Sequence, residues 1–596
     1  MILQQMPPRS RNPEKKKGKK PTVKKATAKL QDLPRLKILP RELMPSVGTK
    51  SLKASIDSHL PNFYNAQEVL PSLSLLASEN QILQSPLKSF TVSGEANTFF
   101  LNIVGEFADI SGFKDLSLFV KKVHLIEPIP FMQGEYALPK DGALPQPAEG
   151  WQRTLAKIHD PYNEAYIDAL CSATLSRLVE LDKSPHWCRF YGTFNARADK
   201  HVYNITDEIS SLKYERWFQK NKKAGVFTIR TVGEDHDVKP LVEIVEEGGA
   251  IECVDLESIS GSIKSDVSEC IEDDEPSTDD ESSSVKSLAE PPVRISKLED
   301  EDDSSVSDDG SDIQNECEYF SEFTNFPVQV TFHERCDGTM DALLDTEEST
   351  TDPLLIETKD QRWSAWIYQV IAALTVAQYY YGFVHNDLHT NNIMWCGTGE
   401  THLYYKLTGP SGTKYYKVPT YGRIMKVIDF GRASFWLKDR EKLFITDSYA
   451  DGNDASGQYN CEPYYDETEE RVNPNASFDL CRLAVSIFDA LYNEAPEPKK
   501  PMKTLSVEPD RVTFETTSEF YNLLWQWLTD DEGMNILRNP DDSERFPDFD
   551  LYKHIARHSK NCVPREQAQI PYFDTQYKIE KHHIPKDATI WEIPLQ

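Results

Sequence analysis

The chain has 596 residues, with 39% hydrophobic and 27% charged side chains, a composition typical of a soluble globular protein long enough for two or more domains. Its net charge of −31 is unevenly distributed, which argues against a uniformly acidic fold. The ten cysteines occur without a C-x-x-C pair or a paired zinc spacing, which argues against a disulfide framework and predicts a reducing intracellular compartment. The N-terminus is basic and Pro-rich without a following apolar core, so no signal peptide is expected.

Two N-terminal segments precede the first clear strand pattern. Residues 1–35 are rich in Lys and predict a disordered basic tail. A solvated arm is the default interpretation, and the alternatives are binding to an import receptor or to nucleic acid through its phosphates. Residues 36–89 carry apolar patches between Ser and Pro and predict an ordered N-terminal extension.

A pattern of short strands begins near residue 90. The stretch S-F-T-V-S-G-E-A-N-T-F-F-L-N-I-V-G places apolar strand formers on both sides of a turn at Gly94. The stretch L-S-L-F-V-K-K-V predicts a further strand that ends in the neighbours Lys121 and Lys122. The many prolines of residues 126–161 predict a loop insertion.

A helix is predicted from residue 163 to residue 181, where apolar positions recur with helical spacing. Two carboxylates, Glu164 and Asp168, lie on nearby faces of this helix. Residues 185–194 then predict the next strand.

Residues 243–318 are dominated by Asp, Glu and Ser, and they predict a disordered acidic insertion because they cannot bury enough apolar surface to fold. A flexible surface insertion is the default. Docking of a basic partner, mimicry of a nucleic-acid backbone and folding back onto the basic tail are the alternatives. Ser277, Ser305 and Ser307 precede acidic residues and suit an acidophilic kinase.

Order is predicted to resume at residues 326–341, where an alternating strand leads into His333, Glu334 and a small turn. Residues 363–384 contain no charged side chain and are long enough to cross a bilayer. Their glutamines and tyrosines, and the polar loop that follows directly, favour a buried helix, so no membrane span is expected.

The stretches H-N-D-L-H-T-N-N at residues 385–392 and V-I-D-F-G at 427–431 hold the groups that phosphoryl transfer needs. That reaction requires an oriented hydroxyl and divalent metals that neutralise the phosphates. Asp387 can orient the hydroxyl and accept its proton. Asn392 and Asp429 offer hard oxygen ligands of the kind that Mg²⁺ prefers. We include His385 as a residue that braces the loop.

Three further features lie in this C-terminal half. The segment between the two stretches predicts a hairpin that turns at residues 409–412. Asp479 leads a predicted buried helix. His554 and His558 have helical spacing, but without a nearby carboxylate they are predicted to be surface residues.

The two stretches resemble the H-R-D-L-x-x-x-N and D-F-G signatures of protein kinases. The resemblance implies an α+β, bilobal protein kinase-like fold with a small β-rich N-lobe at 90–335 and a larger helical C-lobe, with a C-terminal extension, at 336–596. The large insertions and the D-G-T-M-D stretch make the chain similar to Ser/Thr kinase-like proteins of large DNA viruses. That similarity implies protein substrates and a location in host cytoplasm, nucleus or virion.

The resemblance also implies residue roles, with ATP and Mg²⁺ as cofactors. Gly94 would lie over the phosphates. Lys121, rather than Lys122, would hold the α- and β-phosphates, and Glu164, rather than Asp168, would pair with that lysine. His333 would be the gatekeeper, and Glu334 to Cys336 would contact the adenine. Asp479 would brace the loop at 385–392.

The sequence departs from the kinase pattern at several positions. Asn386 replaces the usual Arg, which argues against switching by a phosphate on the activation loop. His389 replaces the usual Lys and is familiar from small-molecule phosphotransferases. No clear A-P-E motif follows D-F-G, and Cys461-Glu462-Pro463 is only suggestive. A kinase-fold scaffold and a small-molecule phosphotransferase are therefore the alternatives to an active protein kinase.

Overall fold

The computed structural model shows a mixed α+β protein. The chain divides into two compact units, Met1–Asp199 with Asn325–Gln596 and Lys200–Thr324. The basic tail, Gly94, and the acidic insertion up to residue 317 lie outside the described residues. The disorder and partners predicted for the two charged segments, and the phosphate contact predicted for Gly94, therefore stay predictions. The described residues are 63–67, 70–72, 87–93, 98–105, 116–138, 149–232, 238–240, 318–349, 351–437, 442–509, 511–539 and 543–596.

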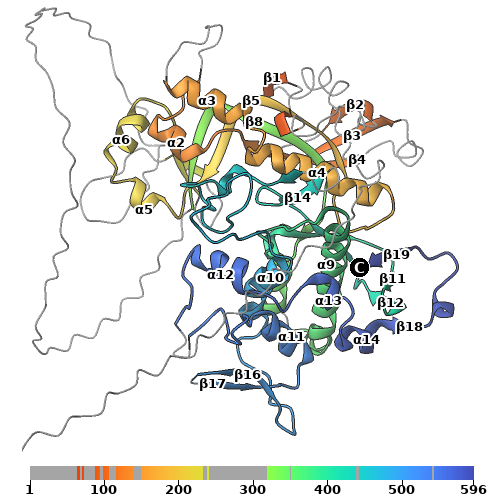
Figure 1. The fold of residues 1–596 in the computed structure, drawn as a ribbon. Coiled ribbons are helices and arrows are strands. Elements are labelled where there is room, and N and C mark those ends of the chain that lie inside the picture. Colours follow the sequence, from red (N-terminus) through yellow and green to blue (C-terminus); the bar gives the residue numbers. More distant parts are fainter. Residues whose placement is uncertain are drawn as a thin grey trace, which may run out of the picture. The chain divides into compact units, whose positions relative to one another are not determined.

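In the first unit, β4 is a central strand of the largest sheet (Figure 1). Lys121 lies on β4. The strand order of this sheet is β1-β5-β8-β4-β3-β2, and β4 and β8 are antiparallel, with Lys121 opposite Thr331. The strands are β1 (Phe63–Gln67), β2 (Leu87–Ser93), β3 (Thr98–Gly105), β4 (Leu116–His124), β5 (Phe190–Asn204) and β8 (Glu318–Glu334).

One helix, α4 (Glu164–Glu180), lies against this sheet, as the pattern at 163–181 predicts. It begins at Asn163, whose side chain accepts from the Ala165 N–H and donates to the Leu125 carbonyl. Tyr166 accepts a hydrogen bond from Asn195 of β5. The predicted loop insertion at 126–161 is wrong in part, because it contains α2 (Pro128–Gln133) and α3 (Glu149–His159).

The helices of the C-terminal half surround α9 (Lys359–Tyr381), which is buried along most of its length. Two of its buried glutamines have partners: Gln369 accepts from the Met425 N–H, and Gln378 donates to the Ala476 carbonyl. In the described residues, no helix has the length and apolarity needed to cross a membrane. The other helices are α7 (Asp341–Ser349), α8 (Pro353–Glu357), α10 (Phe478–Leu491), α11 (Glu519–Trp527), α12 (Asp550–His558), α13 (Pro564–Gln567) and α14 (Pro571–Tyr577).

Small sheets join distant parts of this half. The predicted hairpin is confirmed, with Gly409 opposite Gly412 between β11 (His402–Gly409) and β12 (Gly412–Pro419). It is extended by β19 (Ile590–Pro594), parallel to β11, and by β18 (Lys578–Ile579). The remaining strands of this half are β9 (Gly338–Thr339), β10 (Ile393–Gly397), β13 (Arg423–Val427), β14 (Phe435–Leu437), β15 (Lys442–Phe444), β16 (Thr504–Glu508) and β17 (Arg511–Phe514).

The second unit contains the far ends of β5 and β8 with α5 (Ile209–Leu212), α6 (Arg216–Lys223), β6 (Thr228–Val232) and β7 (Val238–Pro240). Its core includes Phe218 and Phe227, whose ring centroids lie 5.1 Å apart.

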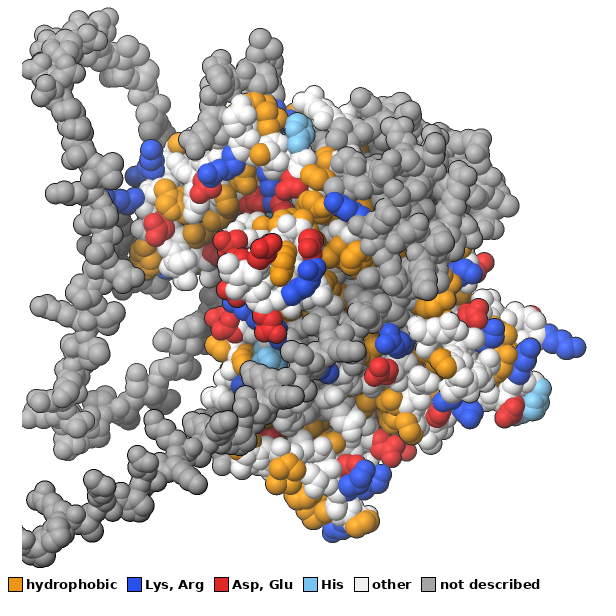
Figure 2. Space-filling model, viewed as in Figure 1, with side chains coloured by type: hydrophobic (Ala, Val, Ile, Leu, Met, Phe, Trp, Pro, Cys, Tyr) orange, Lys and Arg blue, Asp and Glu red, His pale blue; other side chains and the backbone are white. Residues whose placement is uncertain are grey.

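Across the face of the molecule shown in Figure 2, basic and acidic side chains are intermixed with apolar ones.

Candidate functional site

Three charged side chains from three elements meet in what we call the lysine cluster, Lys121, Asp168 and Asp429. The Lys121 Nζ atom lies 2.8 Å from Asp168 Oδ1 and 3.0 Å from Asp429 Oδ1. Asp168 is 2% exposed, whereas Asp429 is 50% exposed. The cluster therefore has a buried end on α4 and an open end after β13.

Burial lowers the pKa of Lys121, but the two carboxylates outweigh burial and hold that pKa above its usual value. Lys121 in turn lowers the pKa of Asp429. Burial raises the pKa of Asp168, although Lys121 opposes that shift. The lysine thus stays charged, and the exposed carboxylate stays ionised.

The choice of Glu164 as the partner of Lys121 is wrong. Glu164 Oε2 accepts from the Ser448 hydroxyl at 3.1 Å, and Lys121 contacts Asp168, one turn further along α4. Burial raises the pKa of Glu164 to about 7. No local sequence signal separates the two carboxylates, because they lie one turn apart on α4 and the position of Lys121 on β4 decides between them.

The loop at 385–392 and the Asp429 segment are joined through backbone groups. His385 Nε2 lies 2.8 Å from the Ile428 carbonyl, and the Ile428 N–H donates to the Asn392 carbonyl at 3.0 Å. Burial lowers the pKa of His385, so the ring is neutral. His385 therefore contacts backbone as a brace, as we expected from the sequence.

Two residues of this region have left-handed backbone conformations that side chains rarely adopt. Asn386 has φ of 67° and Asp429 has φ of 64°. Asn386 is held by Tyr459, which donates to its Oδ1 atom at 2.6 Å. Asp429 precedes Phe430, whose N–H donates to Asp168 at 2.8 Å. Strain of this kind is characteristic of functional sites.

Asp479, on α10, braces the same loop. Its carboxylate accepts the backbone N–H groups of His385 at 2.9 Å and Asn386 at 3.0 Å. The residue is fully buried, and burial raises the pKa of Asp479 to about 7, although both hydrogen bonds oppose the shift.

Asp387 belongs to a second group, which we call the tyrosine relay, Asp387, Tyr552 and Arg482. The Tyr552 hydroxyl donates to Asp387 Oδ1 at 2.6 Å, and Arg482 Nε donates to the Tyr552 oxygen at 3.0 Å. Tyr552 is fixed by stacking on Phe549, with ring centroids 5.2 Å apart. In the described part of the chain, Asp387 Oδ2 makes no hydrogen bond. One oxygen is oriented, and the other has no partner among the described residues.

The donor atoms near the lysine cluster fit a nucleotide with Mg²⁺. Asn392 uses its Nδ2 atom on the Asp387 carbonyl at 2.9 Å and on His389 Nε2 at 3.0 Å. Its Oδ1 atom makes no hydrogen bond to any described residue, and Asp429 is half exposed. Among those residues, no group of three or more His, Cys, Asp or Glu could hold a metal. Phosphate oxygens would therefore have to complete a magnesium site built on Asn392 and Asp429.

In the segment predicted to contact adenine, Glu334 to Cys336, some hydrogen-bonding groups already have partners within the chain. The Glu334 N–H donates to the Arg189 carbonyl at 2.9 Å, and its side chain pairs with Lys426 at 3.1 Å. The Cys336 N–H makes no backbone hydrogen bond within the described ranges. His333 is engaged with Phe190, with ring centroids 6.0 Å apart.

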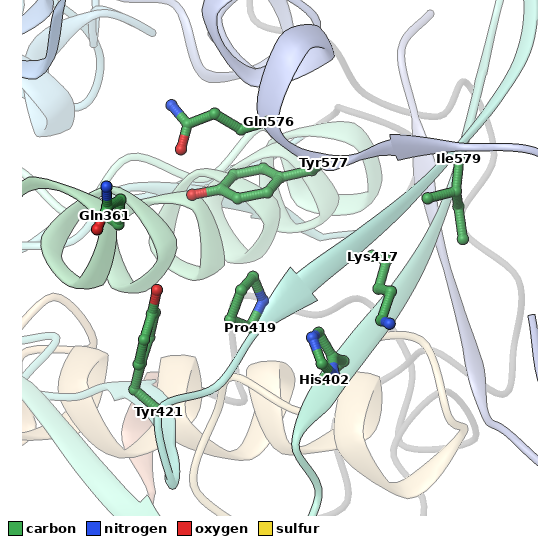
Figure 3. Close-up of a pocket in the computed structure, with 8 residues that line it drawn as sticks. All are labelled: Gln361, His402, Lys417, Pro419, Tyr421, Gln576, Tyr577 and Ile579. Carbon is green, nitrogen blue, oxygen red and sulfur yellow. The ribbon is translucent and has the colours of Figure 1, made fainter. Parts of the chain in front are cut away.

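A separate cavity of about 390 Å³ contains none of these residues. In Figure 3, Tyr577 projects into its centre, with Tyr421 and Gln361 on one side and His402 and Lys417 on the other.

His554 and His558 each have a nearby carboxylate, so the prediction that they lack one is wrong. Asp530 lies 3.2 Å from His554, and Asp531 lies 3.1 Å from His558.

No known protein-family model matches this chain, and no curated protein matches it.

Proposed function

We propose that the chain is a bilobal, protein kinase-like enzyme that transfers the γ-phosphate of ATP to Ser or Thr hydroxyls of proteins. The observation that carries the proposal is the meeting of Lys121, Asp168 and Asp429 next to the loop of Asp387 and Asn392. These groups come from segments far apart in the sequence, and each is the residue type that phosphoryl transfer uses.

On the acceptor side, Asp387 orients the hydroxyl and accepts its proton. Tyr552 holds one carboxylate oxygen, so the carboxylate cannot rotate freely, and such orientation reduces the entropic cost of reaction. The Asp479 carboxylate fixes the loop backbone by accepting hydrogen bonds from two of its N–H groups. Tyr552 and Arg482 act through Asp387 and are positioning residues.

On the nucleotide side, Lys121 holds phosphate oxygens, and Asp168 keeps the ammonium in place. Asn392 and Asp429 would hold Mg²⁺, which supplies neutralisation of the phosphate charge when bound. Burial lowers the pKa of His389, so this ring adds no fixed positive charge beside Asn392.

A small-molecule acceptor is the second candidate, favoured by His389 in place of the usual Lys. The neutral ring accepts from Asn392 at 3.0 Å and does not present a cation to a protein substrate. An alcohol that carries its own positive charge would suit such a site.

The test measures Mg²⁺-dependent transfer of labelled γ-phosphate from ATP to casein, myelin basic protein and the chain itself. Asp387→Ala and Asp429→Ala are compared with Asp489→Asn, an exposed carboxylate whose side chain is 56% accessible. Choline and aminoglycosides are offered in parallel.

We expect transfer to protein that both site variants abolish and Asp489→Asn retains. Transfer to small alcohols alone would replace the proposal with the second candidate. Absence of both transfer and nucleotide binding would contradict it and leave a scaffold.

A further inference from the structure

Three cysteines from distant segments meet close to Glu334 and Lys426. We call Cys188, Cys336 and Cys396 the thiol cluster, and the Cys188 and Cys336 sulfur atoms lie 3.5 Å apart. Cys188 and Cys396 are partly exposed, and Cys336 is 8% exposed. Cys188 lies just before β5, Cys336 lies just after β8, and Cys396 lies within β10.

Backbone hydrogen bonds hold these segments together. The Glu334 N–H donates to the Arg189 carbonyl at 2.9 Å, one residue beyond Cys188. The Asp337 N–H donates to the Trp395 carbonyl at 2.9 Å, one residue before Cys396. The closeness of the thiols therefore follows from the backbone and does not depend on side-chain rotamers alone.

A buried ammonium lies beside the thiol cluster. Lys426 Nζ donates to the Trp187 carbonyl at 3.1 Å and pairs with Glu334 at 3.1 Å. A hydrogen bond from Cys336 lowers the pKa of Cys396, and Lys426 acts in the same direction. Hydrogen bonds to its two neighbours, together with burial, raise the pKa of Cys336. A cationic, partly open environment is the kind that makes thiols reactive.

We propose that the thiol cluster is a site of reversible oxidation, at which a peroxide joins Cys188 and Cys336 in a disulfide. The partly exposed Cys188 sulfur attacks one peroxide oxygen and the O–O bond breaks; the thiol proton passes to the departing oxygen, which gives a sulfenic acid and water. The Cys336 sulfur then displaces the sulfenic oxygen as a second water. Two thiols lose two electrons, and one peroxide is reduced to two waters.

The sulfur atoms must approach from 3.5 Å to about 2.0 Å, which small side-chain rotations can supply. Cys396 lies next to Cys336 and supports it by hydrogen bonding, but it is not consumed. The disulfide would connect the segment before β5 to the segment after β8.

A second thiol pair provides an internal control. Cys481 and Cys562 also interact, because a hydrogen bond between them adds to the effect of burial in raising the pKa of Cys562. Both are fully buried, at 0% exposure. Neighbouring sulfurs without access should remain reduced at peroxide doses that oxidise the thiol cluster.

One consequence rests on the proposed function. Cys336 lies in the segment expected to contact adenine, so the disulfide would fix that segment and lower ATP turnover. The chemical test below requires no kinase activity, and its failure can be told apart from failure of the proposed function.

The full chain, freed of reductant, is treated with hydrogen peroxide, alkylated in denaturant and mapped by mass spectrometry. We expect a Cys188–Cys336 cross-linked peptide that dithiothreitol releases, with Cys481 and Cys562 recovered as free thiols. Cys188→Ser should abolish the cross-link, and Cys396→Ser should retain it.

The proposal is overturned if peroxide leaves Cys188 and Cys336 reduced, or if it oxidises them no faster than Cys481 and Cys562. A disulfide in the wild-type chain that joins Cys336 to Cys396, or either residue to a cysteine outside the cluster, would also overturn it.

Discussion

The lysine cluster and the tyrosine relay hold the carboxylates of Asp429 and Asp387 in different ways. Lys121 contacts Asp429 directly at 3.0 Å, whereas Arg482 reaches Asp387 only through the Tyr552 hydroxyl. A direct ion pair neutralises charge, and its lysine can exchange one anionic partner for another. A hydroxyl relay sets direction and leaves the carboxylate its full charge. The first arrangement suits binding of a phosphate chain, and the second suits acceptance of a proton.

The largest expected effect comes from removing the shared cation. Lys121→Met leaves Asp168 buried without a cation, which should lower the free energy of unfolding by about 3 kcal/mol and phosphate transfer by at least ~100-fold. Urea unfolding and transfer assays measure the two. Lys122→Met removes a neighbouring, exposed lysine and serves as the control. Equal losses in both variants would mean that the lysine cluster has no special role.

The next largest expected effect is a difference in phosphate transfer between substitutions of the two carboxylates of α4. Asp168→Asn should reduce transfer by about 100-fold, because it weakens the hold on Lys121 and places an amide where Oδ2 is buried without a partner among the described residues. Glu164→Gln keeps a partner for Ser448 and should change transfer by less than about threefold. The reverse order would restore Glu164 as the partner of the lysine.

A smaller effect is expected from the relay. Tyr552→Phe removes the hydroxyl that orients Asp387, and the loss of one hydrogen bond to a charged group predicts a fall in kcat of about tenfold with an unchanged KM for ATP. Tyr214→Phe, at 79% exposure, is the matched control. Higher activity in Tyr552→Phe would show that this hydroxyl blocks the acceptor instead.

The smallest effect concerns pH and stability. Asp479 has its pKa raised to about 7 in the folded state, so ionisation is penalised there. The folded state binds more protons than the unfolded state between about pH 4 and 7, and stability falls as pH rises through that window. Asp479→Asn should remove part of this fall. Urea midpoints at pH 5 and pH 8 measure this fall in stability. An identical change in midpoint between the two pH values in the wild type and in Asp479→Asn would show that Asp479 does not cause it.

Local patterns were sufficient to predict several elements of the fold. The charge-free run at 363–384 predicted α9, and the small-residue turn predicted the hairpin at Gly409 and Gly412. The role of Asp479 was predicted from the resemblance to protein kinases, and the structure places its carboxylate on the loop of His385. The helix and the hairpin were each predicted from one contiguous stretch of sequence.

Other features depend on contacts that no local pattern encodes. Tyr552 lies 165 residues beyond Asp387, and nothing near either residue marks the contact. The thiol cluster joins three segments whose cysteines look scattered in the sequence. Helical periodicity could not separate Glu164 from Asp168 because both share a face, and only the position of Lys121 on β4 decides between them.

The parallel pairing of β19 with β11 has a consequence for how the protein is made. The hairpin of β11 and β12 connects the segments that carry Asn392 and Asp429, yet its sheet includes residues 590–594. A ribosome translates the hairpin long before it reaches β19, so this sheet stays incomplete while most of the C-terminal half emerges. Chains whose synthesis stops before residue 590 would carry every proposed catalytic group but an unfinished sheet, a state that cellular quality control can recognise.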